Sequence, residues 1–153
     1  MNIEQRLKEL GITLPAAAAP AANYVPFVLE GKLLFIAGQL PFTVEGKLEH
    51  LGKVGRELTV EQGYQSARLC ALNCLAQARA ALGTLDKVRR IVRVGGFVQC
   101  PDDFTQQPQV INGASDVIVE IFGDKGKHAR AAVGNNALPR GVATEVEMVL
   151  AVE

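Results

Sequence analysis

The alternation of apolar and polar positions in the N-terminal part of the chain predicts a short helix, a connector and a β-hairpin. Apolar residues recur at helical spacing over residues 3–10, which predicts an amphipathic helix. The Ala- and Pro-rich residues 14–22 favour an extended connector, because proline opposes helix formation. Residues 26–29 and 32–37 predict two short strands, joined by a tight turn at Glu30-Gly31.

The longest regular pattern begins at Thr59 and predicts a helix over residues 59–82. Thr59 and Gln62 have the spacing of a capping box, in which each side chain binds a free backbone N–H group of the first turn. Gly83 is a suitable residue at which to end the helix. The apolar stripe of the helix is rich in small residues, which indicates close packing against a sheet. It comprises Tyr64, Ala67, Cys70, Ala71, Cys74, Leu75, Ala78 and Leu82.

The rest of the chain alternates between strand and helix patterns. Residues 88–98 are rich in β-branched side chains and predict a strand, and the apolar face of residues 109–122 predicts a second helix. Two strands, at 128–133 and 143–152, complete the chain, whereas the Gly- and charge-rich residues 40–58 predict a long surface loop. This order of elements predicts an α+β domain with one mixed sheet and two long helices on one face.

The strand predicted in the middle of the chain contains a basic run and a pair of glycines. Simple alternation places Arg89, Ile91 and Arg93 on one face of the sheet and Arg90 on the other. That arrangement is more typical of a solvated or intersubunit surface than of an RNA-binding surface. Gly95-Gly96 suggests a β-bulge or a close approach of another segment to the backbone.

Length and charge limit the possible classes of function. The chain has 153 residues, with 16 Lys+Arg and 16 Asp+Glu, so its formal net charge is zero and its pI is about 6.7. This length suits one domain, residues 1–153, in which we expect residues 1–21 to form an N-terminal helix and connector and residues 22–153 the core. Zero net charge argues against binding to nucleic acid or an anionic membrane through bulk electrostatics.

The cysteine count and the N-terminus indicate the compartment. Three cysteines cannot close a disulfide framework completely, so reduced thiols in the cytoplasm are the natural interpretation. The charged N-terminus does not resemble a signal peptide, and no segment has the ~18 consecutive apolar residues of a membrane span. We therefore expect a soluble cytoplasmic protein.

Common catalytic and ligand-binding motifs are absent from the sequence: there is no nucleophile elbow, phosphate-binding loop or dinucleotide fingerprint. Cys70 and Cys74 lie one helical turn apart, but they are better interpreted as small packing residues than as half of a metal site. Cys100 follows a strand with no base nearby, so a structural role is the better interpretation of this cysteine. His50 lies in a charged loop, so we expect its side chain to be solvated. We expect no metal and no cofactor.

Two charged residues in the last strands are candidates for chemistry. Arg130 is flanked by alanines, and a guanidinium presents paired donors that match a carboxylate. Glu145 opens the last strand and could orient a water molecule or carry a proton, close to Arg130 if the two strands pair as neighbours. The residues alone leave two possibilities open, of which a structural Arg–Glu pair is favoured over a carboxylate-binding site.

Five short motifs follow one another along residues 22–153. They are Tyr24; Ala37-Gly38-Gln39-Leu40-Pro41; Asp103-Phe104 followed by Asn112; Ala129-Arg130-Ala131-Ala132-Val133; and Leu138-Pro139 followed by Val142 and Glu145-Val146-Glu147. In type and order they resemble the motifs of the RidA (YjgF-like) family of enamine/imine deaminases, and Tyr24 and residues 37–41 also have the matching separation.

The resemblance implies a chorismate-mutase-like fold that assembles as a homotrimer, with sites in the clefts between subunits. It implies hydrolysis of reactive 2-enamino and 2-imino acids, such as 2-aminoacrylate, to a 2-oxo acid and ammonia without a metal or cofactor. Under this resemblance Arg130 would hold the substrate carboxylate, and Glu145 would orient the attacking water or relay its proton. The backbone at Gly38 would face the substrate, and Tyr24 and Asn112 would line the pocket.

The chain departs from the family pattern in ways that indicate a divergent subgroup. Ala132 stands where the family commonly has a cysteine, and the stretch between Phe104 and Asn112 is longer than usual. The helix at 3–10 and the loop at 42–58 add to the minimal domain.

Three alternative functions remain open at this level. A non-catalytic module could bind a small carboxylate metabolite in the same cleft. An endoribonuclease would need a basic cleft, which zero net charge and the absence of a histidine pair disfavour. A chorismate mutase would need several cations around a dianion, and a shared fold does not by itself supply a function.

Overall fold

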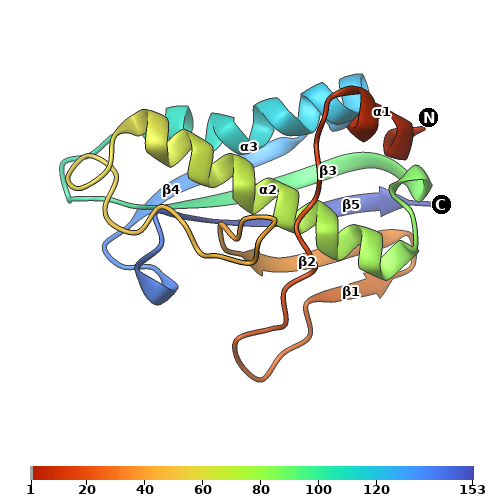
Figure 1. Ribbon diagram of the computed structural model, residues 1–153, viewed down its shortest axis with the longest axis horizontal. Helices are drawn as coiled ribbons and strands as arrows, with labels where there is room; N and C mark the ends of the chain where they lie inside the picture. Colours follow the sequence, from red (N-terminus) through yellow and green to blue (C-terminus); the bar gives the residue numbers. More distant parts are fainter. Residues whose placement is uncertain (1) are drawn as a thin grey trace.

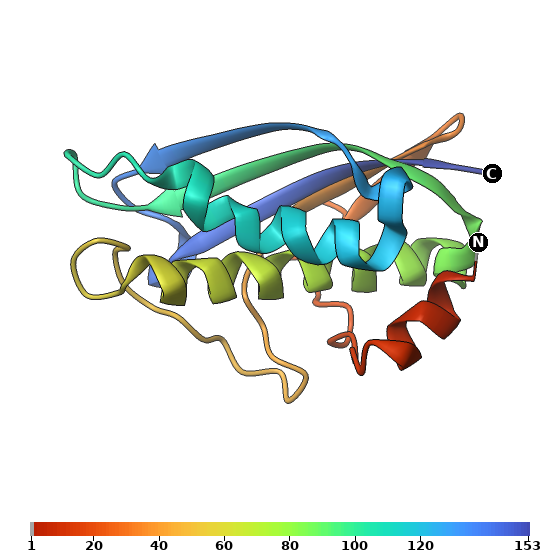
Figure 2. The same ribbon diagram turned by 90° about the horizontal axis from the view of Figure 1, so that it is seen from above.

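A five-stranded sheet with two long helices on one face forms the body of the protein (Figures 1 and 2). The computed structural model describes residues 2–153. The strand order is β1-β2-β5-β3-β4, in which only the β3–β4 pair is parallel. The elements are α1 Ile3–Glu9, β1 Phe27–Glu30, β2 Leu33–Gln39, α2 Val60–Leu82, β3 Val88–Gln99, α3 Gln107–Phe122, β4 Ala129–Asn135 and β5 Thr144–Val152. The predicted α+β class, element order and mixed sheet are confirmed.

The turn of the β1–β2 hairpin lies one residue later than predicted. Glu30 pairs with Leu33, so the two turn residues are Gly31 and Lys32 rather than Glu30 and Gly31. Gly31 has a φ of 60°, and glycine adopts a positive φ at the first turn position without steric cost. The glycine therefore determines the register of the hairpin.

Strand β3 contains two irregularities that overturn the predicted alternation. Its pairing with β5 shifts register between Val88 and Arg90 and again between Ile91 and Arg93. Ile91 is fully buried while Arg89 and Arg93 are exposed, so Ile91 does not share a face with these two arginines. Each bulge adds a residue and resets the side-chain alternation, which lets the arginines avoid the core.

The Gly95-Gly96 pair marks a close approach and not a bulge. No register shift occurs at either glycine. A Cβ on Gly96 would lie 2.6 Å from Ile111 of α3, so the missing side chain is what lets the helix lie directly on the strand.

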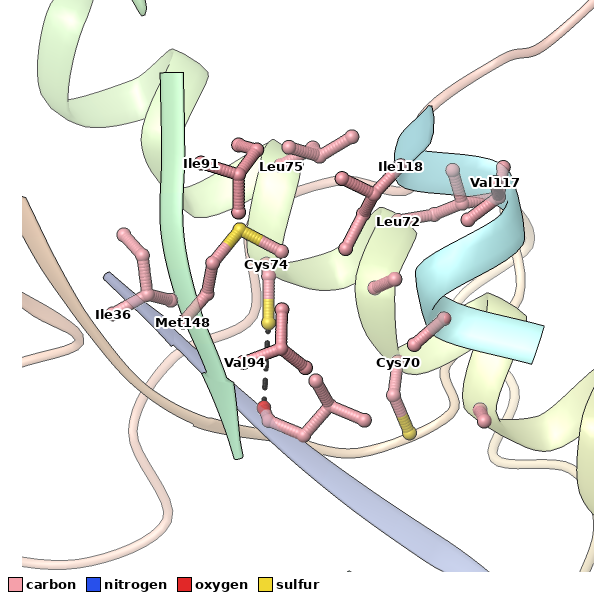
Figure 3. Close-up of a cluster of buried hydrophobic side chains, with 14 of the residues drawn as sticks. Ile36, Cys70, Leu72, Cys74, Leu75, Ile91, Val94, Val117, Ile118 and Met148 are labelled. Atoms are coloured by element: carbon pink, nitrogen blue, oxygen red, sulfur yellow. Dashed lines mark hydrogen bonds between the residues drawn. The ribbon is translucent and has the colours of Figure 1, made fainter. Parts of the chain in front are cut away.

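The core lies between the sheet and the two long helices, and the cysteines of α2 belong to it (Figure 3). Cys74 Sγ lies 3.3 Å from the carbonyl oxygen of Val146, and Cys70 Sγ lies 3.3 Å from the hydroxyl of Thr144. Burial raises the pKa of the Cys70 thiol to about 12, so it stays protonated. Both thiols and that of Cys100 are free and buried, which confirms the interpretation as packing residues.

The segment 40–58 contains no helix or long strand, as predicted, but it is anchored to the body. Leu51 forms an isolated bridge with Val142, and Val54 is fully buried. The prediction of a solvated His50 is wrong: its side chain is 21% exposed, and its carbonyl oxygen accepts a hydrogen bond from Ala143. The turn before β5 is therefore tied to this loop.

The N-terminal helix docks against the ends of the two long helices. Ile3 and Leu7 of α1 are buried. The Glu4 carboxylate accepts hydrogen bonds from the Arg79 guanidinium, at 2.7 and 3.2 Å, and from the backbone N–H of Leu85 at 3.0 Å. These contacts make the extension part of the folded body.

Helices α2 and α3 pack so closely that one position on α3 admits no side chain. A Cβ on Gly113 would overlap the carbonyl oxygen of Tyr64 in α2. Since the obstacle is backbone, no change of rotamer relieves it.

We predict that Gly113→Ala destabilises the protein by about 1–3 kcal/mol or more, although alanine is the better helix former by ~1 kcal/mol. Urea unfolding measures the change. Gln109→Ala, at an exposed position of the same helix, should leave the free energy of unfolding within about 0.5 kcal/mol. Equal stability of the Gly113 and Gln109 variants would contradict the close packing.

Candidate functional site

Arg130 lies on edge strand β4 with its side chain directed toward α3. In the register of the sheet it pairs with Val94, whose side chain is buried on the helix-covered face. Its Nη1 donates to Asn112 Oδ1 at 2.9 Å and to Ser115 Oγ at 3.1 Å, and its Nη2 donates to the Pro108 carbonyl oxygen at 3.3 Å. The structure therefore brings together Arg130 and Asn112, two of the residues that the sequence singles out.

The three hydrogen bonds leave part of the guanidinium available. A guanidinium has five N–H bonds, of which three are directed at the partners above. The N–H on Nε and the second one on Nη2 have no hydrogen-bond partner among residues 2–153. These two atoms share one edge of the group, the geometry that binds both oxygens of a carboxylate.

A histidine stands behind the arginine. Ser115 Oγ lies 2.8 Å from His128 Nε2, and His128 Nδ1 lies 2.6 Å from the carbonyl oxygen of Gly126. A carbonyl oxygen only accepts, so Nδ1 carries the proton and Nε2 accepts from the Ser115 hydroxyl. Burial lowers the pKa of His128, and the charge of Arg130 lowers it further against the opposing effect of the Gly126 hydrogen bond. The neutral histidine orients Ser115 so that its oxygen accepts from Arg130.

Ser115 and His128 do not stand out in the sequence as site residues, although each follows a spacing rule. His128 precedes Arg130 by two residues along the chain, and Ser115 follows Asn112 by three, which is one helical turn. The spacing alone does not show that the strand lies beside this turn of the helix, so the signal is weak without the fold.

Glu145 lies at the start of β5, on the sheet face that carries no helix in the described part of the chain. A Cβ on Gly38 of β2 would overlap Oε2 of Glu145, so the glycine provides the space for the carboxyl group. Burial raises the pKa of Glu145, and the nearby charge of Glu147 raises it further. Oε2 of Glu147 lies 4.0 Å from Nη1 of Arg93, whereas Glu145 has no hydrogen bond or ion pair within residues 2–153.

Tyr24 lies close to the same glycine, in the connector before β1. Its side chain is half exposed, and its hydroxyl accepts from the backbone N–H of Ala21 at 3.4 Å. Tyr24 and Gly38 line a pocket of about 150 Å³ together with Phe42 and Arg140. Arg140 does not stand out in the sequence as a candidate, and only the fold places it at this pocket.

The candidate residues form two groups on opposite faces of the sheet. Arg130 and Asn112 lie on the helix side, whereas Glu145 lies on the open side against Gly38. Tyr24 lies in the connector before β1 and lines a pocket with Gly38. The expectation that the strands of Arg130 and Glu145 pair as neighbours is wrong, because β3 lies between them. The favoured structural Arg–Glu pair is likewise wrong, since no ion pair joins them in residues 2–153. One copy of the chain cannot bring both groups to the same small molecule.

Metal-ligating residues do not gather at either group. Nowhere in residues 2–153 do three or more His, Cys, Asp or Glu side chains come together in a way that could hold a metal ion. In the same residues, no helix has both the length and the apolar character needed to cross a membrane.

Comparison with known proteins shows relatives along the whole chain. A family model described as YjgF/chorismate mutase-like, putative endoribonuclease, matches residues 4–150. Protein TCP17 of Trypanosoma cruzi is 48% identical over 150 residues, which cover 97% of this chain and 93% of that protein. The crystal structure of Atu1372 from Agrobacterium tumefaciens is 47% identical, with a TM-score of 0.91 over 99% of this chain and 92% of that one. A putative endoribonuclease from Shewanella oneidensis MR-1 is 34% identical, with a TM-score of 0.95 over 99% of this chain and 100% of that one.

The half-buried His128 makes stability depend on pH. Its pKa is lower in the folded state than the ordinary value of 6.5, so the unfolded state binds the proton more readily and stability falls as the pH drops below 6.5. We predict that His128→Gln reduces this pH dependence, as measured by urea unfolding between about pH 5 and 8. His50→Gln, which removes the other histidine and leaves these contacts intact, is the matched control. An unchanged slope in His128→Gln would contradict the assignment.

Proposed function

Because the chain belongs to the YjgF/chorismate mutase-like family, we propose that it hydrolyses reactive 2-enamino and 2-imino acids of the 2-aminoacrylate type to 2-oxo acids and ammonia. No metal or cofactor takes part in this proposal. The protein would act in the cytoplasm, where its three free cysteines remain reduced.

The observation that carries the proposal is the Arg130 guanidinium with one edge unoccupied. An amide, a hydroxyl and a carbonyl oxygen hold it, and none of these neutralises its charge. The unoccupied edge on Nε and Nη2 fits the carboxylate that every 2-imino acid carries. Asn112 and Ser115 act as positioning residues for this contact.

Glu145 supplies the proton transfers in the proposed reaction. An enamino acid first takes a proton from the solvent on C3 and becomes the iminium ion. Water then attacks C2 while Glu145 accepts one of its protons, and the C=N π electrons go to nitrogen, which gives a neutral carbinolamine. Glu145 returns the proton to that nitrogen. The hydroxyl group on C2 then gives its proton to the Glu145 carboxylate and forms the C=O bond while the C–N bond breaks, so the 2-oxo acid and ammonia leave and the proton taken up at C3 goes back to the solvent. A carboxyl group with a raised pKa is suited to both transfers.

We propose that the complete site forms between two copies, with Arg130 and Asn112 from one and Glu145, Gly38 and Tyr24 from the next. Members of the family are generally oligomeric. The open sheet face exposes apolar side chains at Val28, Phe35 and Val133, which are 49%, 44% and 46% exposed. Contact through this face in a homotrimer would bury them and would bring the open side of one copy to the edge strand of another.

We predict that Arg130→Ala lowers kcat/KM for 2-imino acids between about 30-fold and about 3,000-fold, as expected when a partner of a desolvated charge pair is removed. The imines are generated in situ by an amino-acid oxidase or a serine/threonine dehydratase. Release of ammonia and 2-oxo acid is followed, with semicarbazide to trap the free imine. Arg89→Ala, at an exposed arginine of β3, is the control for loss of charge.

Two variants together test the shared site. Arg130→Ala and Glu145→Gln should each have only a small residual activity alone, but co-expressed they should regain about a quarter of the wild-type activity in a cyclic trimer with random mixing. Failure to regain activity, with mixed oligomers shown by mass spectrometry, would place both residues in one copy or outside the site.

The other functions are distinguished in the same assay. Binding of 2-oxo acids without turnover of any imine would favour a non-catalytic metabolite-binding module. Cleavage of RNA that falls with added salt and is lost in Arg130→Ala would favour the endoribonuclease named in the family description.

The Glu145 carboxyl group should limit the stability of the protein. Its pKa in the folded state lies above the ordinary value of 4.5, so the folded state binds the proton more readily than the unfolded state. The free energy of unfolding therefore falls as the pH rises from 4.5 to above the folded-state pKa, and this loss of stability is present at pH 7. We predict that Glu145→Gln has a higher Tm than the wild type at pH 7 and that the difference vanishes near pH 4. Glu45→Gln, in the exposed loop after β2, should show no such difference. A lower Tm for Glu145→Gln at pH 7 would contradict the raised pKa.

A further inference from the structure

The pocket beside Gly38 has polar and cationic walls that the proposed reaction does not yet use. It has a volume of about 150 Å³ and lies between the connector before β1 and the turn before β5. The aromatic side chains of Tyr24 and Phe42, the amide of Gln39 and the guanidinium of Arg140 belong to residues that line it. Gly38 belongs both to this pocket and to the contact with Glu145, so the pocket opens beside the proposed site of proton transfer.

Two buried amides, of Gln77 and Gln39, are hydrogen-bonded to each other beside the pocket. Gln77 is 1% exposed, and its Nε2 donates to the Ala18 carbonyl oxygen at 2.7 Å and to Gln39 Oε1 at 3.4 Å. Gln39 is 6% exposed, and one hydrogen of its Nε2 goes to the Ala37 carbonyl oxygen at 3.0 Å. The second hydrogen on that nitrogen has no partner within residues 2–153, which leaves a donor in the lining of the pocket.

Arg140 is held in a backbone conformation that arginine rarely adopts. Its φ is 58°, a left-handed conformation that costs a residue with a side chain about 1–2 kcal/mol. Its guanidinium lies 5.9 Å from the centre of the Phe42 ring, within the range of a cation–π contact. Throughout residues 2–153 it forms no ion pair, so its charge is not neutralised by the protein.

We infer that this pocket receives the side chain of the 2-imino acid and selects side chains that end in a carboxylate. The inference rests on the function proposed above and specifies its substrate class. A carboxylate would accept from Arg140 and from Gln39, while its methylene groups would lie against Tyr24 and Phe42. A cavity of ~150 Å³ holds a six-carbon ring, so it has room for the side chain of 2-iminosuccinate or 2-iminoglutarate. The preferred substrates are therefore 2-imino dicarboxylic acids.

The test compares an acidic with a neutral substrate of similar size. The imines of glutamate and glutamine are generated in situ, and the ratio of their kcat/KM values is measured. In the wild type we expect the ratio to favour the glutamate imine. In Arg140→Gln we expect the ratio to fall by about 10-fold to about 100-fold, because the variant loses a charge-assisted hydrogen bond to the substrate carboxylate. Arg140→Glu should invert the preference toward the imine of lysine. Arg89→Gln is the matched control, and thermal melts establish that each variant is folded.

Direct binding separates this inference from the proposed function. Titration calorimetry with 2-oxoglutarate should show an affinity that falls at least about 10-fold in Arg140→Gln, whether or not any imine is turned over. If no imine is hydrolysed but this difference persists, the proposed reaction fails and the acidic-ligand pocket stands. An unchanged substrate ratio together with unchanged 2-oxoglutarate affinity in Arg140→Gln would overturn the pocket assignment.

Discussion

The central position of β5, hydrogen-bonded to β2 on one side and to β3 on the other, determines where chemistry can occur in this protein. Successive side chains of a strand point to opposite faces, so β5 buries Val146 and Met148 beneath α2 and directs Glu145 to the open face. Strand β4 lies beyond β3, and its Arg130 points to the helix side. The cation and the acid are thus held apart by the backbone of the sheet, which is why the proposed site needs a second copy of the chain.

Glycines determine how closely the elements approach each other. Gly113 lets α3 lie against the backbone of α2, and Gly96 lets the same helix lie on β3. These two contacts hold the start of α3 beside β4, where Asn112 meets Arg130. Gly38 has a different effect, because the space of its missing side chain is taken by the Glu145 carboxyl group. Positions without a side chain therefore determine both how the helices pack and where the Glu145 carboxyl group lies.

The two groups of candidate residues share an electrostatic property: each leaves one charge unbalanced. Neutral partners hold Arg130, and His128 behind it stays neutral because burial lowers its pKa. Glu145 has no cation beside it within residues 2–153, and burial raises its pKa. A direct Arg–Glu pair would have cancelled both charges and left nothing for a ligand. Separation by the sheet leaves the cation without an acidic partner and the acid without a cation, as the roles proposed for Arg130 and Glu145 require.

Local patterns in the sequence determined the elements, the capping box at Thr59 and the family motifs, because helix and strand periods and turn residues are properties of neighbouring positions. Residue type and position identified Arg130 and Glu145 as candidates, and the family resemblance added Asn112, Gly38 and Tyr24. The tertiary structure alone decided the strand order, the two bulges that bury Ile91, and the placement of Ser115, His128 and Arg140 beside those candidates. Each of these depends on contacts between residues far apart in the chain, and no periodicity in a single segment encodes which segment will lie next to it.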